Sequence, residues 1–344
     1  MSERVLSSNA AVADFGFRYT LGDRNVFSGT DVHKRIIKQK YSKKNDMECS
    51  AQLYWKFLTE AMSSEINGVV GEEVFVPDFM VTCRRIILQT MTYEMIGKRV
   101  VEMYGAVNNN ANFVSDFMVF QDLVEDCTAK AAVCPTWLAT FLFLNDCQNK
   151  RLELVSKIEN AISRALDSSE GDEDDSMGRW LLSVHALTKD DNISKLYTLN
   201  DIADFTVGLM FAAHKNASIA AAQALLYSLE FDRLREDGSD LDGALLMCDM
   251  CTEARAMLKA VSLPGSSIMD SLGTCEVIEK VVLETLRVTA HSIGAVRKVV
   301  VKEGWQVTVP DDDNDPASPV KQYLLPYGSY VGVSHIIHHR DAQR

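Results

Sequence analysis

Three polar side chains stand side by side in a long apolar stretch: His214, Lys215 and Asn216, within Phe205–Leu229. Burying a polar group without a partner costs about 1–3 kcal/mol, so the cluster needs partners, water or a ligand. The His214 imidazole can act as an acid or base near neutral pH. Lys215 and Asn216 can donate hydrogen bonds to a substrate carbonyl and activate it. We predict these three residues as catalytic, with a water-filled kink in the helix as the alternative.

The residues just before this cluster are apolar, and two of them are small. We expect Phe211, Ala212 and Ala213 to contact the substrate.

Glu284 and Arg287 are three positions apart on a predicted helix, a spacing at which an ion pair forms on one face. We predict a structural role for this pair rather than a catalytic one.

Two further patterns have a spacing that metal sites use. Cys248 and Cys251 form a CxxC, but a zinc site needs a second ligand pair and none is near in the sequence. His335 and His339 are four residues apart, but no acidic partner completes an HExxH pattern. We predict no metal site.

Composition limits the class of protein. The 344 residues are 47% hydrophobic and carry a formal net charge of −13, which supports a large core and argues against nucleic-acid binding. The sequence contains no run of about 18 or more apolar residues, so no transmembrane anchor is predicted. The N-terminus lacks the apolar core of a secretory signal, so we expect a cytoplasmic protein with reduced cysteines.

Hydrophobic periodicity predicts that residues 15–295 are mostly helical. The segments with helical spacing are Asp78–Tyr104, Arg151–Leu166, Leu199–Glu230 and Ser271–Val288. The third is apolar nearly all round, so it should cross the centre of the molecule, with Asn200 and Asp201 as cap candidates.

Residues 296–335 are richer in β-branched side chains. Short strands are predicted at 296–301 and 305–309, followed by a hairpin of 323–325 and 330–333 that turns at Tyr327 and Gly328. The predicted fold class is mainly α with a small β appendage, in a single domain over residues 1–344.

Three stretches, in order, resemble the cytochrome P450 monooxygenases, and among them the sterol 14α-demethylase branch. They are the central helix FTVGLMFAAHKNASIAAAQALLYSL, the E-x-x-R motif ETLR (284–287) with HSIGAVRKV after it, and YLLPYGSYVGVSHIIHHRD. RNVFSGTDVHKRIIKQK is similar to a heme-side helix, although His33, Lys34 and Arg35 in it are expected on a solvated face. The resemblance implies a cytochrome P450-like fold with a long central helix. It also implies that Arg297 matches a heme-propionate contact; without heme, Arg297 is either a clamp for a substrate anion or a charge at a strand end.

Two departures from the family's pattern argue against oxygen activation. No F-x-x-G-x-R-x-C-x-G loop, which supplies the heme thiolate, occurs in the 344 residues. Asn216 stands where the family usually has the threonine of its proton relay, and an amide does not replace a hydroxyl there equally well. We therefore expect a truncated fold that lacks the N-terminal anchor and the cysteine loop and that binds no cofactor. Heme is expected only if the chain is a fragment of a longer protein.

The resemblance and its departures together favour a heme-independent enzyme. An apolar cavity would template the cyclisation or isomerisation, such as a cycloaddition, of a terpenoid- or polyketide-like substrate in specialised metabolism. The expected partners are a small hydrophobic substrate and other enzymes of the same pathway. Two alternatives stay open: a heme-dependent monooxygenase represented by a truncated chain, and a non-catalytic protein that binds a hydrophobic ligand or a cytochrome P450.

Overall fold

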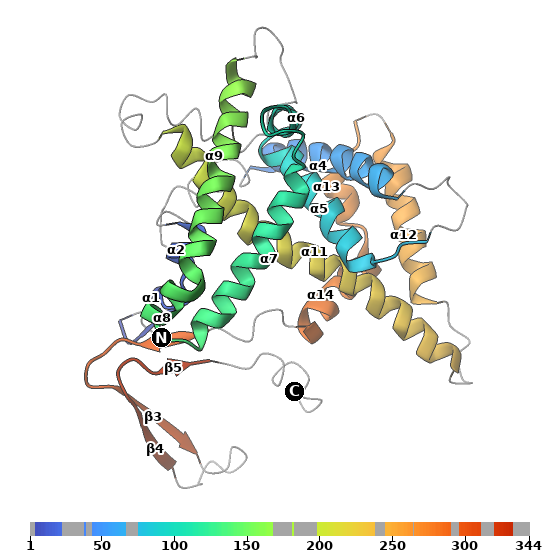
Figure 1. The fold of residues 1–344 in the computed structure, drawn as a ribbon. Coiled ribbons are helices and arrows are strands. Elements are labelled where there is room, and N and C mark those ends of the chain that lie inside the picture. The colour runs from blue at the N-terminus through green and yellow to red at the C-terminus, as the bar shows by residue number, and fades with distance from the viewer. Residues whose placement is uncertain are drawn as a thin grey trace.

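The computed structural model describes residues 4–22, 38, 43–66, 75–167, 181, 198–237, 245–263, 265–289, 296–310 and 320–332. Most of these residues are helical (Figure 1). The helices of the N-terminal half are α1 (Ser8–Ala13), α2 (Phe17–Leu21), α4 (Lys44–Glu65), α5 (Phe79–Met95), α6 (Lys98–Val107), α7 (Phe113–Ala132), α8 (Thr136–Ala139), the π-helical turn η1 (Thr140–Leu144) and α9 (Asn145–Asp167). The later helices are α11 (Leu199–Asp237), α12 (Leu246–Val261), α13 (Ile268–Leu272) and α14 (Glu276–Thr289).

The strands form two small antiparallel sheets. One has the order β1 (Leu6–Ser7), β2 (Arg297–Val299) and β5 (Tyr330–Val331), and so joins the two ends of the chain. The other pairs β3 (Trp305–Pro310) with β4 (Val320–Leu325) and projects away from the helices in Figure 1. The predicted class, mainly α with a small β appendage, is confirmed.

Helix α11 crosses the molecule beneath α5 and α7 in Figure 1, and it packs on α5, α9, α12 and α14. Its first half is buried, as its apolar sequence predicts. Its second half is more exposed and carries Leu226, Tyr227 and Phe231 at the surface. The N-cap is Thr198, whose hydroxyl accepts from the Asp201 N–H at 3.2 Å, while the Asp201 carboxylate accepts from the Thr198 N–H at 2.8 Å. Asn200 instead donates to Glu159 at 2.7 Å.

Gly97 divides the predicted helix at Asp78–Tyr104. Its φ of 97° lies in the left-handed region that glycine tolerates, so α5 ends at Met95 and α6 begins at Lys98. The Asp78 carboxylate accepts from the Val81 N–H at 2.9 Å and fixes the start of α5.

The helix predicted over Ser271–Val288 is confirmed from Glu276 onward, but its predicted start is wrong. Helix α13 ends at Leu272, and α14 begins at Glu276. The Glu253 carboxylate of α12 accepts from the N–H groups of Val277 and Ile278 at 2.9 and 3.0 Å, which sets the start of α14 there. A capping carboxylate that comes from another helix leaves no signal in the sequence around the start of the helix that it caps.

The predicted hairpin at 323–333 is also wrong. The turn exists, with Ser329 N–H donating to the Pro326 carbonyl at 3.1 Å and Gly328 at a φ of 84°. The strands on either side of the turn, however, belong to different sheets. β4 pairs along six residues with β3, and Tyr330 pairs with Lys298 of β2. The longer register with β3 satisfies more backbone groups than a short hairpin would.

The core consists of two clusters of unequal size. The larger lies among α5, α6, α7, α9 and the first half of α11, and it includes Tyr104, Phe113, Phe117 and Phe205. The smaller holds Met257, Ile268 and Cys275, against which Trp55 of α4 packs. Hydrophobic burial therefore stabilises the N-terminal helices more than α12, α13 and α14.

Carboxylates from other helices begin all three of these later helices. Asp232 of α11 accepts from the N–H groups of Leu246 and Met247, both at 2.8 Å, at the start of α12. Glu48 of α4 accepts from the Ser267 hydroxyl at 2.7 Å and from the N–H groups of Ile268 and Met269 at the start of α13. These bonds hold the Glu48 pKa down to about 2. With Glu253 on α14, each cap joins two helices that are separate in the sequence.

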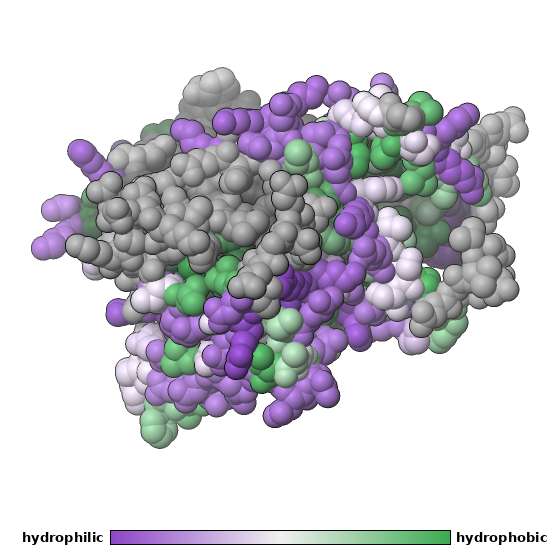
Figure 2. All heavy atoms as spheres, turned by 90° about the horizontal axis from the view of Figure 1, so that it is seen from above, coloured by the Kyte–Doolittle hydropathy of each residue, from purple (hydrophilic) through white to green (hydrophobic). Residues whose placement is uncertain are grey.

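On the face seen in Figure 2, hydrophobic side chains reach the surface in small patches among hydrophilic ones. In the described part of the chain, no helix combines the length and the apolar character needed to cross a membrane.

We predict that Glu48→Gln lowers the free energy of unfolding by about 1 kcal/mol at pH 7, because α13 loses its charged cap. The carboxylate contributes fully above its ordinary pKa of 4.5, and its contribution is lost as pH falls towards about 2. Urea unfolding should therefore show wild type and variant converging at acidic pH. Glu303→Gln, at an exposed carboxylate, is the control; an equal loss in both variants would contradict the cap.

Candidate functional site

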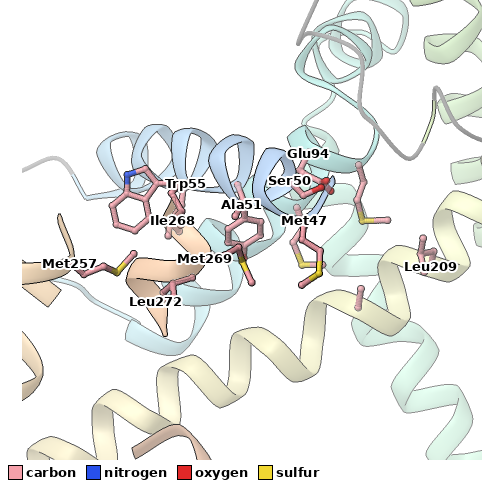
Figure 3. A pocket seen from close by; sticks show the side chains of 15 residues that line it. Met47, Ser50, Ala51, Trp55, Glu94, Leu209, Met257, Ile268, Met269 and Leu272 are labelled. Carbon is pink, nitrogen blue, oxygen red and sulfur yellow. The ribbon is translucent and has the colours of Figure 1, made fainter. Parts of the chain in front are cut away.

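An apolar pocket of about 580 Å³ lies among α4, α5, α11, α12 and α13 (Figure 3). Helix α4 supplies one wall from positions three and four apart, which lie on one helix face. The lining residues are Met47, Ser50, Ala51, Tyr54, Trp55, Leu58, Met91, Glu94, Met95, Leu209, Ala213, Met257, Ile268, Met269 and Leu272. A concave, mainly apolar cavity of this size with few polar groups is typical of small-molecule sites.

Glu94 and Tyr54 are the titratable groups of this lining. Glu94 is 6% exposed, although it lies on α5 among apolar residues. Burial, together with the nearby charge of Glu94, raises the pKa of Tyr54 to about 12. The Tyr54 phenol thus stays protonated at neutral pH and can donate a hydrogen bond, while Glu94 supplies a carboxylate beside it.

The structure does not bring His214, Lys215 and Asn216 together at this pocket. Successive helical positions are about 100° apart, so the three side chains leave α11 in different directions. Asn216 is exposed, and Lys215 forms an ion pair with Glu125 of α7. None of the three lines the pocket, and their predicted catalytic role stays a prediction.

His214 is fully buried between α5 and α7. Its Nε2 lies 2.9 Å from the backbone carbonyl of Arg84, and its Nδ1 lies 2.9 Å from the side-chain amide of Gln121. Burial lowers the pKa of His214 to about 4, so the ring is neutral at pH 7. The atom 2.9 Å from Nδ1 is Oε1 of Gln121, so both ring nitrogens face oxygen atoms that accept. A neutral ring has one N–H and donates to one of these two oxygens.

Of the predicted substrate contacts, Ala213 lines the pocket. Phe211 packs beside Phe17 on the larger core, with ring centroids 6.5 Å apart, and Ala212 lies outside the lining. Arg297 is in β2, where its guanidinium donates to the carbonyl of Val296 at 3.1 Å. Neither Phe211 nor Arg297 reaches the pocket.

Glu284 and Arg287 form the predicted ion pair on α14, with Nη2 and Oε1 at 2.5 Å. Both side chains are about half exposed, at 57% and 45%. The pair thus lies at the surface, and its predicted structural role stays a prediction.

Of the two patterns with the spacing of metal ligands, one lies within the described residues and the other lies outside them. Cys248 and Cys251 lie exposed on α12. Within the described residues, no group of three or more His, Cys, Asp or Glu side chains is placed to hold a metal ion. His335 and His339, and likewise His33, Lys34 and Arg35, fall outside the described residues.

The sequence-based prediction missed Glu94, Tyr54 and the methionines. A signal for Glu94 was present, since it is a lone acid in the apolar face of a predicted helix. The stripe of Met47, Ser50, Tyr54 and Leu58 on α4 also has helical spacing. What the sequence does not show is that α4 and α5 face α13 across a cavity.

By sequence, the chain matches no protein-family profile and no curated protein. Its structure is similar to the heme domain of cytochrome P450DA, with a TM-score of 0.56 and 15% identity over 99% of this chain and 66% of that one. It is similar also to a second cytochrome P450, CYP102L1, with a TM-score of 0.56 and 14% identity over 98% of this chain and 69% of that one. The chain thus spans about two thirds of each structure and has a cytochrome P450-like fold.

The described residues do not fit a thiolate-held heme. Heme iron in cytochromes P450 is bound by a deprotonated cysteine. None of the eight cysteines lines the pocket.

We predict that His214 makes stability sensitive to mild acid. The unfolded chain binds a proton at its ordinary pKa of 6.5, but the folded chain binds it only near 4. Stability is therefore full above pH 6.5 and falls as the pH drops towards 4, by about 2 kcal/mol between pH 7 and 5. Urea unfolding at both pH values measures this loss.

His214→Gln replaces the imidazole with an amide, which keeps a hydrogen-bonding side chain at the site but removes the titration. The variant should lose about 2 kcal/mol less than wild type between pH 7 and 5, whatever its stability at pH 7. Equal losses in the two proteins would show that His214 does not titrate as its burial requires.

Proposed function

We propose that this chain is a heme-independent enzyme that binds an apolar terpenoid- or polyketide-like molecule in the pocket and directs its isomerisation or cyclisation. The single observation that supports this function is the pocket itself, a cavity of about 580 Å³ with an apolar lining and one carboxylate beside one phenol. Binding a flexible chain in a reactive conformation lowers the entropic part of the barrier.

In an isomerisation, Tyr54 and Glu94 would have separate roles. The Tyr54 hydroxyl, with its pKa raised to about 12, donates a hydrogen bond to a substrate carbonyl and stabilises negative charge that develops on that oxygen. The Glu94 carboxylate removes a proton from the carbon beside the carbonyl and returns it two carbons away. The double bond moves into conjugation, and no electron or oxygen atom is exchanged.

For a cyclisation, the proposal depends on the side chains that form the walls of the pocket. Five methionines line it, and their unbranched side chains adapt to an irregular ligand surface. A cycloaddition needs no proton transfer, so Tyr54 alone would activate an electron-poor double bond through its carbonyl.

A non-catalytic carrier of a hydrophobic ligand is the second candidate. The position of the His214, Lys215 and Asn216 side chains favours it, because none of these groups reaches the pocket. Tight binding of an apolar ligand with no product would identify this function.

We predict turnover under argon, with a chelator and without reductase, of two probes: a β,γ-unsaturated ketone and a triene with a tethered enone. Mass spectrometry should detect an isomer of unchanged mass. Loss of all activity without oxygen, or with the chelator, would contradict a heme-independent enzyme.

Glu94→Gln should lower the rate of isomerisation by about 100-fold or more while it changes the binding affinity for the ketone little. Glu102→Gln, at an exposed carboxylate on α6, is the control and should keep the wild-type rate. Equal rates in Glu94→Gln and wild type would exclude Glu94 as the base.

A further inference from the structure

The α4 wall of the pocket runs from Met47 to Leu58, a rise of about 16 Å along the helix axis. Figure 3 shows Met47, Ser50 and Glu94 towards one end of this row and Trp55, Ile268 and Met257 towards the other. A cavity of this form suits a linear chain better than a compact ring system.

The two ends differ in chemistry. The Glu94 end combines a buried carboxylate with the Ser50 hydroxyl, and the opposite end is apolar. Tyr54, also in the lining, is close enough to Glu94 for that charge to raise its pKa. In its proposed role as a base Glu94 is ionised, and a negatively charged head group beside it would be repelled, since charges interact strongly where water is excluded. A hydroxyl or carbonyl head group would instead accept from the Tyr54 phenol.

Trp55 lies at the apolar end, where it packs against the cluster of Met257, Ile268 and Cys275. Ile268 is 5% exposed, and its backbone N–H is bound by Glu48 at 2.8 Å. Because both Trp55 and Glu48 are on α4, the indole and the α13 residue beside it are fixed to the same helix. Trp55 and Ile268 at this end of the pocket are thus held beside each other through α4.

We infer that the ligand is a linear apolar molecule with an uncharged polar head at Glu94, and that Trp55 limits the length of its chain. This inference rests on the proposed function, because it concerns the same pocket. It adds the class of ligand and a residue that determines specificity.

The experiment measures binding of n-alcohols from octanol to hexadecanol by calorimetry. Affinity for wild type should rise about fourfold for each methylene that enters the pocket, and stop rising at a limiting length. Trp55→Ala should move that limit to a longer alcohol, by two methylenes or more, and leave shorter alcohols within about twofold. Trp55→Leu, a smaller change, should give a smaller shift and serves if Trp55→Ala does not fold.

Trp137→Ala is the control, since this tryptophan is 74% exposed and lies outside the pocket; it should keep the wild-type limit. Dodecanoate should bind wild type at least tenfold more weakly than dodecanol, and Glu94→Gln should reduce that difference. A limit that does not move in either Trp55 variant, or dodecanoate that binds as tightly as dodecanol, would overturn the inference while the proposed function stands. No binding of any alcohol to wild type would count against both.

Discussion

Three carboxylates, each from another helix, hold the C-terminal helices in place by accepting hydrogen bonds from their first N–H groups. The larger core secures α5, α6, α7, α9 and the first half of α11, but the cluster around Ile268 is small. Asp232, Glu48 and Glu253 begin α12, α13 and α14 respectively, and each acid comes from a different helix. A capping carboxylate satisfies N–H groups that would otherwise lose water on burial, and its charge suits the positive end of the helix dipole. The later helices therefore depend on directed polar contacts as well as on burial.

This arrangement places the pocket at the junction of two differently stabilised regions. Met91, Glu94 and Leu209 come from helices of the larger core, whereas Met257, Ile268 and Leu272 come from the helices that carboxylates position. Helix α4 contributes to both, through its wall of the pocket and through Glu48. The shape of the cavity thus depends on the α4–α13 contact more than on any one lining residue.

Local patterns in the sequence predicted where the helices and strands lie better than they predicted which elements contact one another. The apolar periodicity of Leu199–Glu230 was sufficient for most of α11, because its cause lies within that segment. The helical spacing of Asp78–Tyr104 likewise predicted the residues of α5 and α6, although not the break at Gly97 between them. The division of α13 from α14 depends on Glu253, and the pairing of β4 depends on β3, so both causes lie elsewhere in the chain. The candidate site was harder to predict for the same reason, since Glu94 and Tyr54 face one cavity from two helices.

The polar triplet of α11 shows why unusual residues in a buried helix need not form a site. A polar cluster in an apolar segment requires partners, and His214 finds them in Gln121 and the Arg84 carbonyl, while Lys215 finds Glu125. These bonds join α11 to α5 and α7, so the requirement is met by helix packing and not by a ligand. A cytochrome P450-like fold does not by itself specify chemistry, because function depends on the groups that line a site. Here those groups are mostly apolar side chains, five of them methionines, with one phenol and one carboxylate among them, and the proposed function depends on these last two.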